Sequence, residues 1–244
     1  MDAFELGIYI RYRNLMIAAK SVNMDDFFSA NPQKIQIEDV ADMYDAFCFD
    51  GYGTLYNRGN FVYDGALDWY RFLRAKGKHL RLVTNAASDV DKALAYEAEK
   101  RGFDFEASET ISSGSLLQEL ASELRTRGRI LDEAFYIGRP SGVKVLDACG
   151  ITPKEFPNES VVCISSAKDT PESYARALEI LRQPNSLLIV LNSDAWAPNI
   201  DGTRNPVSGA LCERLRLEAS ASGHSVETHY LGKPFPAIWK KLKN

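Results

Sequence analysis

The 244-residue sequence contains little cysteine and no long apolar run. Its four cysteines, Cys48, Cys149, Cys163 and Cys212, lie far apart and form no CxxC pair, which disfavours a zinc site and fits a reduced protein. Cys48 and Cys163 lie within apolar runs and are interpreted as small core residues. No run reaches the ~20 apolar residues that a membrane span needs, and no apolar signal core follows the first residues. We therefore expect a cytoplasmic protein without a membrane partner.

Positive charge is also in short supply. Lysine and arginine total 29 against 33 aspartate and glutamate residues, a formal net charge of -4, and no basic stripe stands out. This argues against a nucleic-acid partner. Hydrophobic residues make up 45% of the chain, enough for one sizeable core and a smaller one. The expected partner is a small molecule held together with a cation.

Strand-like and helical patterns alternate from residue 45 onward. The strand-like runs are 45–50, 79–86, 134–138, 161–166 and 187–192, and 228–234 is a strand that leads into a loop. Helical patterns cover 64–77, 88–102, 143–150, 171–183 and 208–223, and in 110–128 a polar turn leads into a helix. Such alternation predicts an α/β protein with parallel strands, and ligands bind at the carboxyl ends of strands in such sheets.

The patterns also suggest a division into domains. Residues 1–44 form a leader, with helices expected at 4–20 and 37–44 that either pack on the main domain or serve as a dimerisation arm. Residues 45–128 and 225–244 are predicted to form the main domain, and 129–224 an inserted domain.

The first candidate site follows the run DAFCFD. Asp50 ends this strand, and Gly51 and Gly53 allow the backbone to turn sharply and approach a ligand. An aspartate can attack phosphorus and form an aspartyl-phosphate, and a divalent cation would offset the repulsion between carboxylate and phosphate. The alternative is an ordinary β-turn with a capping aspartate.

Two further segments place polar groups near predicted strand ends. Thr84 offers a hydroxyl, followed by Asn85, where a phosphoryl oxygen could bind. Lys233 is held between Gly232 and Pro234 in a fixed loop, where its ammonium could neutralise a nucleophile and a phosphate. Taken alone, Thr84 and Asn85 could be an ordinary polar strand end. Lys233 alone could be a surface lysine in a turn.

Taken in order, the acid, the hydroxyl and the lysine resemble a known pattern. DAFCFDGYGTL, the later TN and the GKP tripeptide are similar to motifs one to three of the haloacid dehalogenase superfamily. The opening from Asp50 to Ser88, the segments LNSDAW and NPVSGAL, and YLGKPFPAIW resemble its NagD-like, p-nitrophenylphosphatase-like branch. The similarity covers about residues 45–240.

The resemblance implies a fold and a set of roles. The fold would be a Rossmann-like parallel-sheet core with an inserted α/β cap domain of the C2 type. Asp50 would be the nucleophile and a Mg²⁺ ligand, with the backbone carbonyl of Tyr52 as a second ligand. Thr84 would bind the phosphoryl group and Lys233 would orient and neutralise it.

A second set of residues would contact the substrate. These are Gly51 and Asn85 beside the nucleophile and the phosphoryl site, and Asn192 and Asp194 on a cap loop. A turn after a strand is the alternative for the last two. The implied reaction is magnesium-dependent hydrolysis of a small phosphorylated metabolite.

The sequence departs from the family at two places. Phosphatases of this superfamily usually carry a second aspartate where this chain has Tyr52, and a phenol of pKa near ~10 is a poor general base at neutral pH. After Lys233 the sequence shows no acidic loop like the fourth motif, and the strand of Asp50 would then lie at an exposed sheet edge.

These departures leave alternatives open. The chain could be a fragment of a longer parent, which we favour, or a second copy or another chain could cover the edge, or catalysis could be lost. A dehalogenase-like hydrolase attacking carbon and a catalytically impaired relative acting as a binding protein are the competing functions.

Overall fold

The structure is a computed structural model that describes residues 2–18 and 36–243. It contains two compact units, residues 1–84 with 91–111 and residues 85–90 with 112–244. Both contain helices and parallel strands, so the predicted α/β class is confirmed. The units do not follow the predicted boundaries at 128 and 224, and those domain limits stay a prediction.

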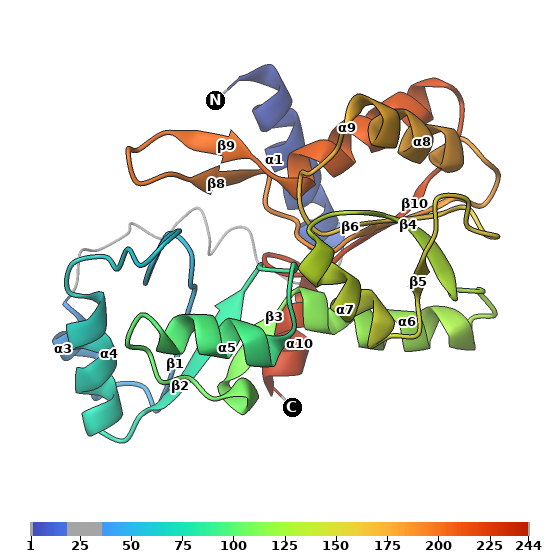
Figure 1. Ribbon diagram of the computed structural model, residues 1–244. Coiled ribbons are helices and arrows are strands. Elements are labelled where there is room, and N and C mark those ends of the chain that lie inside the picture. Colours follow the sequence, from blue (N-terminus) through green and yellow to red (C-terminus); the bar gives the residue numbers. More distant parts are fainter. Residues whose placement is uncertain (1, 19–35, 244) are drawn as a thin grey trace. The chain divides into compact units, whose positions relative to one another are not determined.

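The first unit is built around a three-stranded sheet. Its elements are α1 (Ala3–Ala18), α3 (Ile37–Ala41), β1 (Ala46–Phe49), α4 (Ala66–Ala75), β2 (His79–Thr84), α5 (Asp91–Glu99), the 3₁₀ turn η1 (Ala107–Glu109) and β3 (Thr110–Ser112). The strand order is β1-β2-β3, and β1 runs parallel to β2 with Phe49 beside Leu82. Figure 1 shows β1 and β2 side by side, with α4 next to them.

An aromatic core fills this unit. Tyr56, Tyr70, Phe103 and Phe105 pack with the leucines of β2 and with one face of α4. The helix α4 forms because apolar residues recur at helical spacing, so that Ala66, Tyr70 and Leu73 are all buried on the same side.

Strand β1 lies at an edge of the sheet in the described part of the chain, as the sequence predicts. Its residues alternate between exposed and half-buried. The interpretation of Cys48 as a core residue is therefore wrong: its side chain is exposed on this edge strand, whereas Cys163 is fully buried as predicted.

The second unit contains a five-stranded sheet. Its elements are η2 (Gly114–Leu116), α6 (Leu117–Thr126), β4 (Glu133–Ile137), η3 (Pro140–Gly142), α7 (Val143–Asp147), β5 (Thr152–Pro153), β6 (Val161–Ile164), α8 (Pro171–Leu181), β7 (Leu187–Val190), β8 (Trp196–Pro198), β9 (Arg204–Pro206), α9 (Ser208–Ala221), β10 (Glu227–Tyr230) and α10 (Pro236–Lys243). The sheet order is β10-β7-β6-β4-β5, and all its pairings are parallel.

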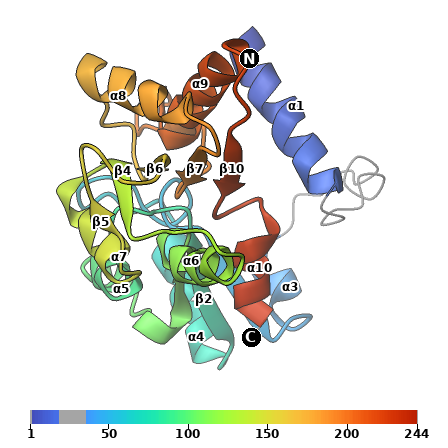
Figure 2. The same cartoon turned by 90° about the vertical axis from the view of Figure 1, so that its right-hand side faces the viewer.

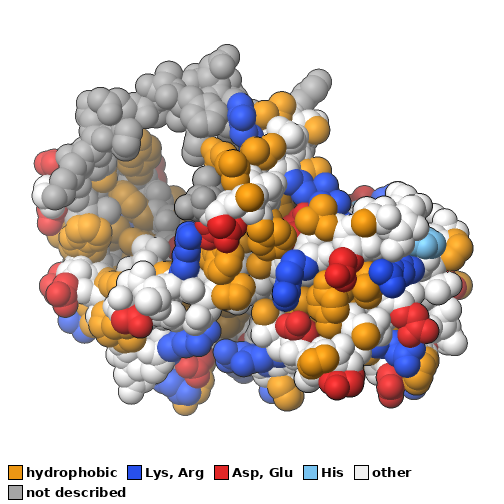
Figure 3. Space-filling model, turned by 90° about the horizontal axis from the view of Figure 1, so that it is seen from above, with side chains coloured by type: hydrophobic (Ala, Val, Ile, Leu, Met, Phe, Trp, Pro, Cys, Tyr) orange, Lys and Arg blue, Asp and Glu red, His pale blue; other side chains and the backbone are white. Residues whose placement is uncertain are grey.

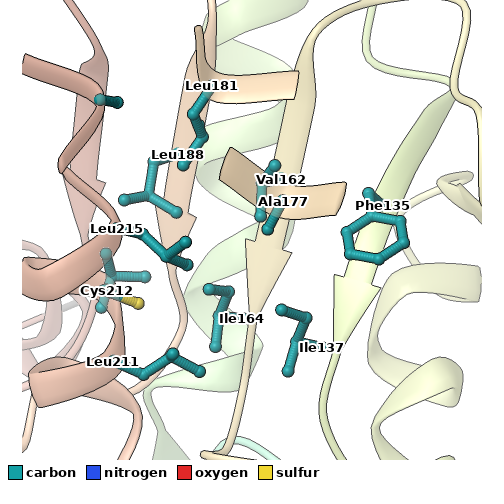
Figure 4. Packing of buried hydrophobic residues seen from close by; sticks show 12 residues of the cluster. Phe135, Ile137, Val162, Ile164, Ala177, Leu181, Leu188, Leu211, Cys212 and Leu215 are labelled. Carbon is teal, nitrogen blue, oxygen red and sulfur yellow. The ribbon is translucent and has the colours of Figure 1, made fainter. Parts of the chain in front are cut away.

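Helices cover both faces of this sheet. Figures 1 and 2 show α8 and α9 on one face and α6 and α7 on the other. The strands β6 and β7 are buried along their whole length, which explains their continuous apolar sequences. Figure 4 shows Ile164 and Leu188 of these strands facing Leu215 and Cys212 of α9.

The surface shows no strong segregation of charge on the face seen in Figure 3, where basic and acidic side chains are interspersed. None of the helices in the described residues is long and apolar enough to cross a membrane.

Several elements differ from the sequence predictions. Strand β3 lies where the sequence predicts a polar turn leading into a helix within 110–128, because Thr110 to Ser112 extend the sheet, and the helix α6 starts at Leu117. The short antiparallel hairpin β8–β9 and the helix α10 were not predicted. The leader helix ends at Ala18, and the rest of its predicted range lies outside the described residues.

Candidate active site

Asp50 and Thr84 lie at the carboxyl-terminal ends of two neighbouring strands in the first unit's sheet. Strand β1 ends at Phe49, immediately before Asp50, and β2 ends at Thr84. Because the two strands are parallel and Phe49 lies beside Leu82, their carboxyl ends coincide. Asp50 is half-buried and Thr84 is 3% exposed. The predicted nucleophile and phosphoryl-binding hydroxyl are therefore placed together by strand pairing.

The loop after Asp50 is closed by backbone hydrogen bonds. The carbonyl of Gly51 accepts bonds from the N–H groups of Thr54, Leu55 and Tyr56 at 3.2, 2.9 and 3.1 Å. The N–H of Gly53 donates to the carbonyl of Tyr56 at 2.9 Å, and Gly53 has a φ of 92° that favours glycine. These bonds close a tight turn directly after Asp50.

Tyr56 is a site residue that the sequence analysis missed. It is 2% exposed, and its ring packs against Tyr52, Phe103 and the guanidinium of Arg101. Burial raises the pKa of Tyr56 far above its usual range, and the negative charge of Asp50 adds to that effect. Its phenol therefore stays neutral beside the nucleophile loop. Its position six residues after Asp50, within the glycine loop, was the available signal.

The oxygen atoms near Asp50 fit the chemistry of a magnesium site. The backbone bonds that close the loop are made by the Gly51 carbonyl and the Gly53 N–H. Among the described residues, no hydrogen bond ends on the carbonyl of Tyr52. That carbonyl and the Asp50 carboxylate are hard oxygen donors, and Mg²⁺ is usually held by one or two carboxylates together with water and phosphate. No cluster of three or more His, Cys, Asp or Glu side chains suited to a metal occurs in the described part of the chain.

The lysine loop belongs to the second unit and follows β10. Gly232 has a φ of 87°, and the bond from Lys233 to Pro234 is cis. A side chain at position 232 would collide with Asn85 Oδ1 and would lie 2.7 Å from the Cβ of Ser113. Glycine is thus the residue that fits, and Lys233 itself is half-exposed.

Asn85 contacts this loop through both ends of its carboxamide. Its Oδ1 accepts the backbone N–H of Lys233 at 2.7 Å, and its Nδ2 donates to the Lys233 carbonyl at 2.9 Å. The same Nδ2 donates to Asp194 Oδ1 at 2.8 Å. The structure therefore brings Asn85, Asp194 and Lys233 together, as residues from three distant parts of the sequence.

Two serines that the sequence analysis did not select complete this network. Ser193 Oγ donates to the Lys233 carbonyl at 2.6 Å, and Ser113 Oγ donates to the Asn85 carbonyl at 2.9 Å. Both serines are almost fully buried. Nothing in their local sequence marks them, because their role depends on the approach of three loops.

Asn192 lies in the same loop as Asp194 and forms hydrogen bonds within the turn. Its Oδ1 accepts the backbone N–H of Asp194 at 2.8 Å, and its own carbonyl accepts a bond from Ser208 Oγ at 2.9 Å. The turn is fixed further because Gly209 N–H donates to the Asp194 carbonyl at 2.8 Å. Asn192 thus shapes the turn that presents the exposed Asp194.

Comparison with known proteins relates this fold and this set of residues to a family of hydrolases. The family model of haloacid dehalogenase-like hydrolases matches residues 47–152, which include Asp50, Tyr52, Thr84 and Asn85. The resemblance inferred from the motifs is confirmed for this part of the chain, and the relatives support a hydrolase.

The chain is similar to two phosphatases in sequence and to a third in fold. The chain is 27% identical over 211 residues to chronophin from Mus musculus, covering 84% of this chain and 70% of that protein. It is 27% identical over 230 residues to glycerol-3-phosphate phosphatase from Rattus norvegicus, covering 84% and 68%. The structure of a 4-nitrophenylphosphatase from Thermotoga maritima has a TM-score of 0.67 at 24% identity, covering 84% of this chain and 74% of that one.

Proposed function

We propose that this chain is a magnesium-dependent phosphatase in which Asp50 is the nucleophile. The observation that carries the proposal is the position of Asp50 and Thr84 at the coinciding ends of two parallel strands, with a tight glycine loop directly after Asp50. The similarity to two phosphatases supports the same chemistry. A small phosphorylated metabolite is the proposed substrate.

The reaction would proceed in two steps. An oxygen of Asp50 attacks phosphorus, the bond from phosphorus to the leaving oxygen breaks, and that oxygen takes a proton from water or leaves as a stabilised anion. Water then attacks the aspartyl-phosphate, releases inorganic phosphate and restores the carboxylate. Thr84 would donate its hydroxyl hydrogen to a phosphoryl oxygen, and Lys233 would balance the negative charge.

A bound Mg²⁺ would lower the repulsion between the carboxylate and the phosphate. Asp50 and the Tyr52 carbonyl would hold it. Gly51, Asn192 and Asp194 remain proposed contacts to the substrate.

Tyr52 supports a second proposal, that proton transfer in this chain is slow. Its phenol lies edge-on to Tyr56 with ring centroids 5.1 Å apart and is 37% exposed, where the family pattern has a carboxylate. The same residue keeps a dehalogenase-like attack on carbon and a silent binding role as competing proposals, since neither needs a proton donor at this position.

The decisive experiment is the hydrolysis of p-nitrophenyl phosphate with and without magnesium. Its leaving group departs as a stabilised anion, so the assay does not depend on a proton donor at Tyr52. Activity should require both magnesium and Asp50, and Asp50→Asn should abolish it. Asp45→Asn, at an exposed aspartate just before the same strand, is the matched control and should keep the wild-type rate. Activity that survives Asp50→Asn would overturn the proposal.

A further inference from the structure

The carboxamide of Asn85 has both of its N–H hydrogens engaged within the protein. One set of bonds joins it to the backbone of Lys233, and the other joins it to Asp194. An Asn side chain offers two donor hydrogens, and here both point at protein acceptors. A predicted substrate contact would have to compete with these bonds.

We propose that Asn85 is a positioning residue, which fixes the Lys233 loop, and that Asp194 in turn orients Asn85. This inference rests on the proposed function, because it assigns Lys233 the charge-balancing role described above. It replaces direct substrate binding as the role of Asn85.

The partners determine which end of the amide faces which way. Lys233 N–H is a donor, so the Asn85 oxygen must face it at 2.7 Å. The Lys233 carbonyl and the Asp194 carboxylate are acceptors, so the nitrogen must face both. The planar amide thereby grips the N–H and the carbonyl of one residue at the same time, which leaves the loop little freedom to rotate.

Packing around the grip supports the same role. Asn85 is 3% exposed, and the neighbouring Gly232 approaches it so closely that no side chain fits there. Ser193 adds a second donor to the Lys233 carbonyl, and Ser113 fixes the carbonyl of Asn85 itself. The backbone of Lys233 is thus held from two directions, while its side chain is half-exposed.

The hydrogen bonds between Asn85 and the Lys233 backbone matter for function because of where Asn85 lies in the chain. Asn85 follows Thr84 directly, and Thr84 is the proposed phosphoryl-binding residue. One peptide bond therefore joins the hydroxyl-bearing residue to the side chain that holds the lysine loop. Small misplacements of a charge-balancing group reduce rates strongly, by up to ~100-fold for about 1 Å.

The test compares Asn85→Asp, Asp194→Asn and the double variant that carries both changes, called the exchanged pair, in kinetic assays with p-nitrophenyl phosphate. Asn85→Asp places two carboxylates together and removes the donor to the Lys233 carbonyl, so kcat should fall by about 10- to 100-fold with little change in KM. In the exchanged pair, the new carboxylate at position 85 can accept from Lys233 N–H and from the new amide at position 194, so kcat should recover by about tenfold. Asn158→Asp, on an exposed loop, is the matched control and should leave both constants unchanged.

A second readout does not depend on activity. Hydrogen exchange at the Lys233 amide should accelerate by about tenfold or more in Asn85→Ala, because its acceptor is lost. Exchange in β6 serves as the internal control for an intact sheet.

The outcomes separate the two proposals. Unchanged exchange at Lys233 in Asn85→Ala, or a raised KM with an unchanged kcat in Asn85→Asp, would overturn the positioning role. If the wild-type chain hydrolyses no phosphate while exchange at Lys233 responds to Asn85→Ala, the grip is supported and the proposed phosphatase function is what fails.

Discussion

The hydroxyl of Tyr56 occupies the space that a side chain at position 51 would need. A Cβ on Gly51 would lie 2.6 Å from Tyr56 Oη and 3.4 Å from a methyl group of Leu82. Tyr56 is buried and enclosed by Phe103 and Arg101, so it cannot withdraw easily. Glycine at 51 therefore permits the ring of Tyr56 to pack against the loop that follows Asp50.

From this contact, Gly51→Ala should lower both stability and phosphatase activity. Forcing a methyl group into a filled space typically costs about 1–3 kcal/mol, and relief would require the loop at Asp50 to shift. Urea unfolding and the p-nitrophenyl phosphate assay measure the two effects. Gly7→Ala in α1, where nothing lies within 4 Å, is the control and should not destabilise the protein. Equal stability of the two variants would contradict the packing argument.

Replacing Tyr52 with aspartate should change which phosphate esters are hydrolysed. An alkyl phosphate has a poor leaving group that needs a proton, and a well-placed acid contributes about 100- to 10,000-fold. Tyr52→Asp should therefore raise the rate on an alkyl phosphate far more than the rate on p-nitrophenyl phosphate. The exposed Tyr44→Asp adds the same charge elsewhere and should have no such effect.

The same variant discriminates among the competing functions. If the wild-type chain releases halide from a haloacid and Tyr52→Asp loses that activity, the carbon-attacking proposal gains support. If neither variant acts on any ester or haloacid, the silent binding role is favoured.

The sequence predicted the strands that carry chemistry because each is a short apolar run ending in a polar residue. Asp50, Thr84 and Lys233 could be selected from such local patterns, and the structure places all three at or just beyond strand ends. Cys48 was misplaced because an apolar run does not reveal whether its strand is central or at an edge.

Contacts between distant loops could not be predicted from local sequence patterns. The grip of Asn85 on Lys233 spans 148 positions, and Ser193 and Ser113 join it through buried hydroxyls that no local pattern marks. The hairpin β8–β9 escaped for another reason, since its strands are three residues each and contain proline.

Acid should weaken the first unit partly through Glu109. Its carboxylate accepts hydrogen bonds from both terminal nitrogens of Arg74, one of them at 2.7 Å, and Arg81 lies 3.9 Å away. The bond to Arg74 lowers the pKa of Glu109 below its usual value, and a hydrogen bond from the Glu106 backbone and the charges of Arg74 and Arg81 act in the same direction. The unfolded chain therefore binds this proton more readily than the folded one.

The sign gives a defined pH window. The stabilisation by Glu109 is fully present above the unfolded pKa of about 4.3 and is lost as the pH falls through the lower folded value. Glu109→Gln should cost about 1–2 kcal/mol near neutral pH, and its difference from wild type should shrink below about pH 4. Urea unfolding from about pH 7 to pH 3 measures this, with the exposed Glu99→Gln as the control. A difference that stays constant with pH would show that charge plays no part.

The core of the second unit offers a matched pair of substitutions on one helix. Leu215 and Leu217 both lie on α9, but Leu215 is fully buried and Leu217 is 47% exposed. Figure 4 shows Leu215 directed at the strands, near Leu188.

Leu215→Ala should cost about 2–5 kcal/mol, since it removes buried methyl groups and leaves a cavity that the sheet cannot fill. Leu217→Ala should change stability by no more than about 0.5 kcal/mol, since its side chain already contacts water. Because helix propensity changes equally in both variants, the difference between their urea midpoints isolates the packing contribution. Equal losses would mean that α9 is held by its backbone and ends rather than by its buried face.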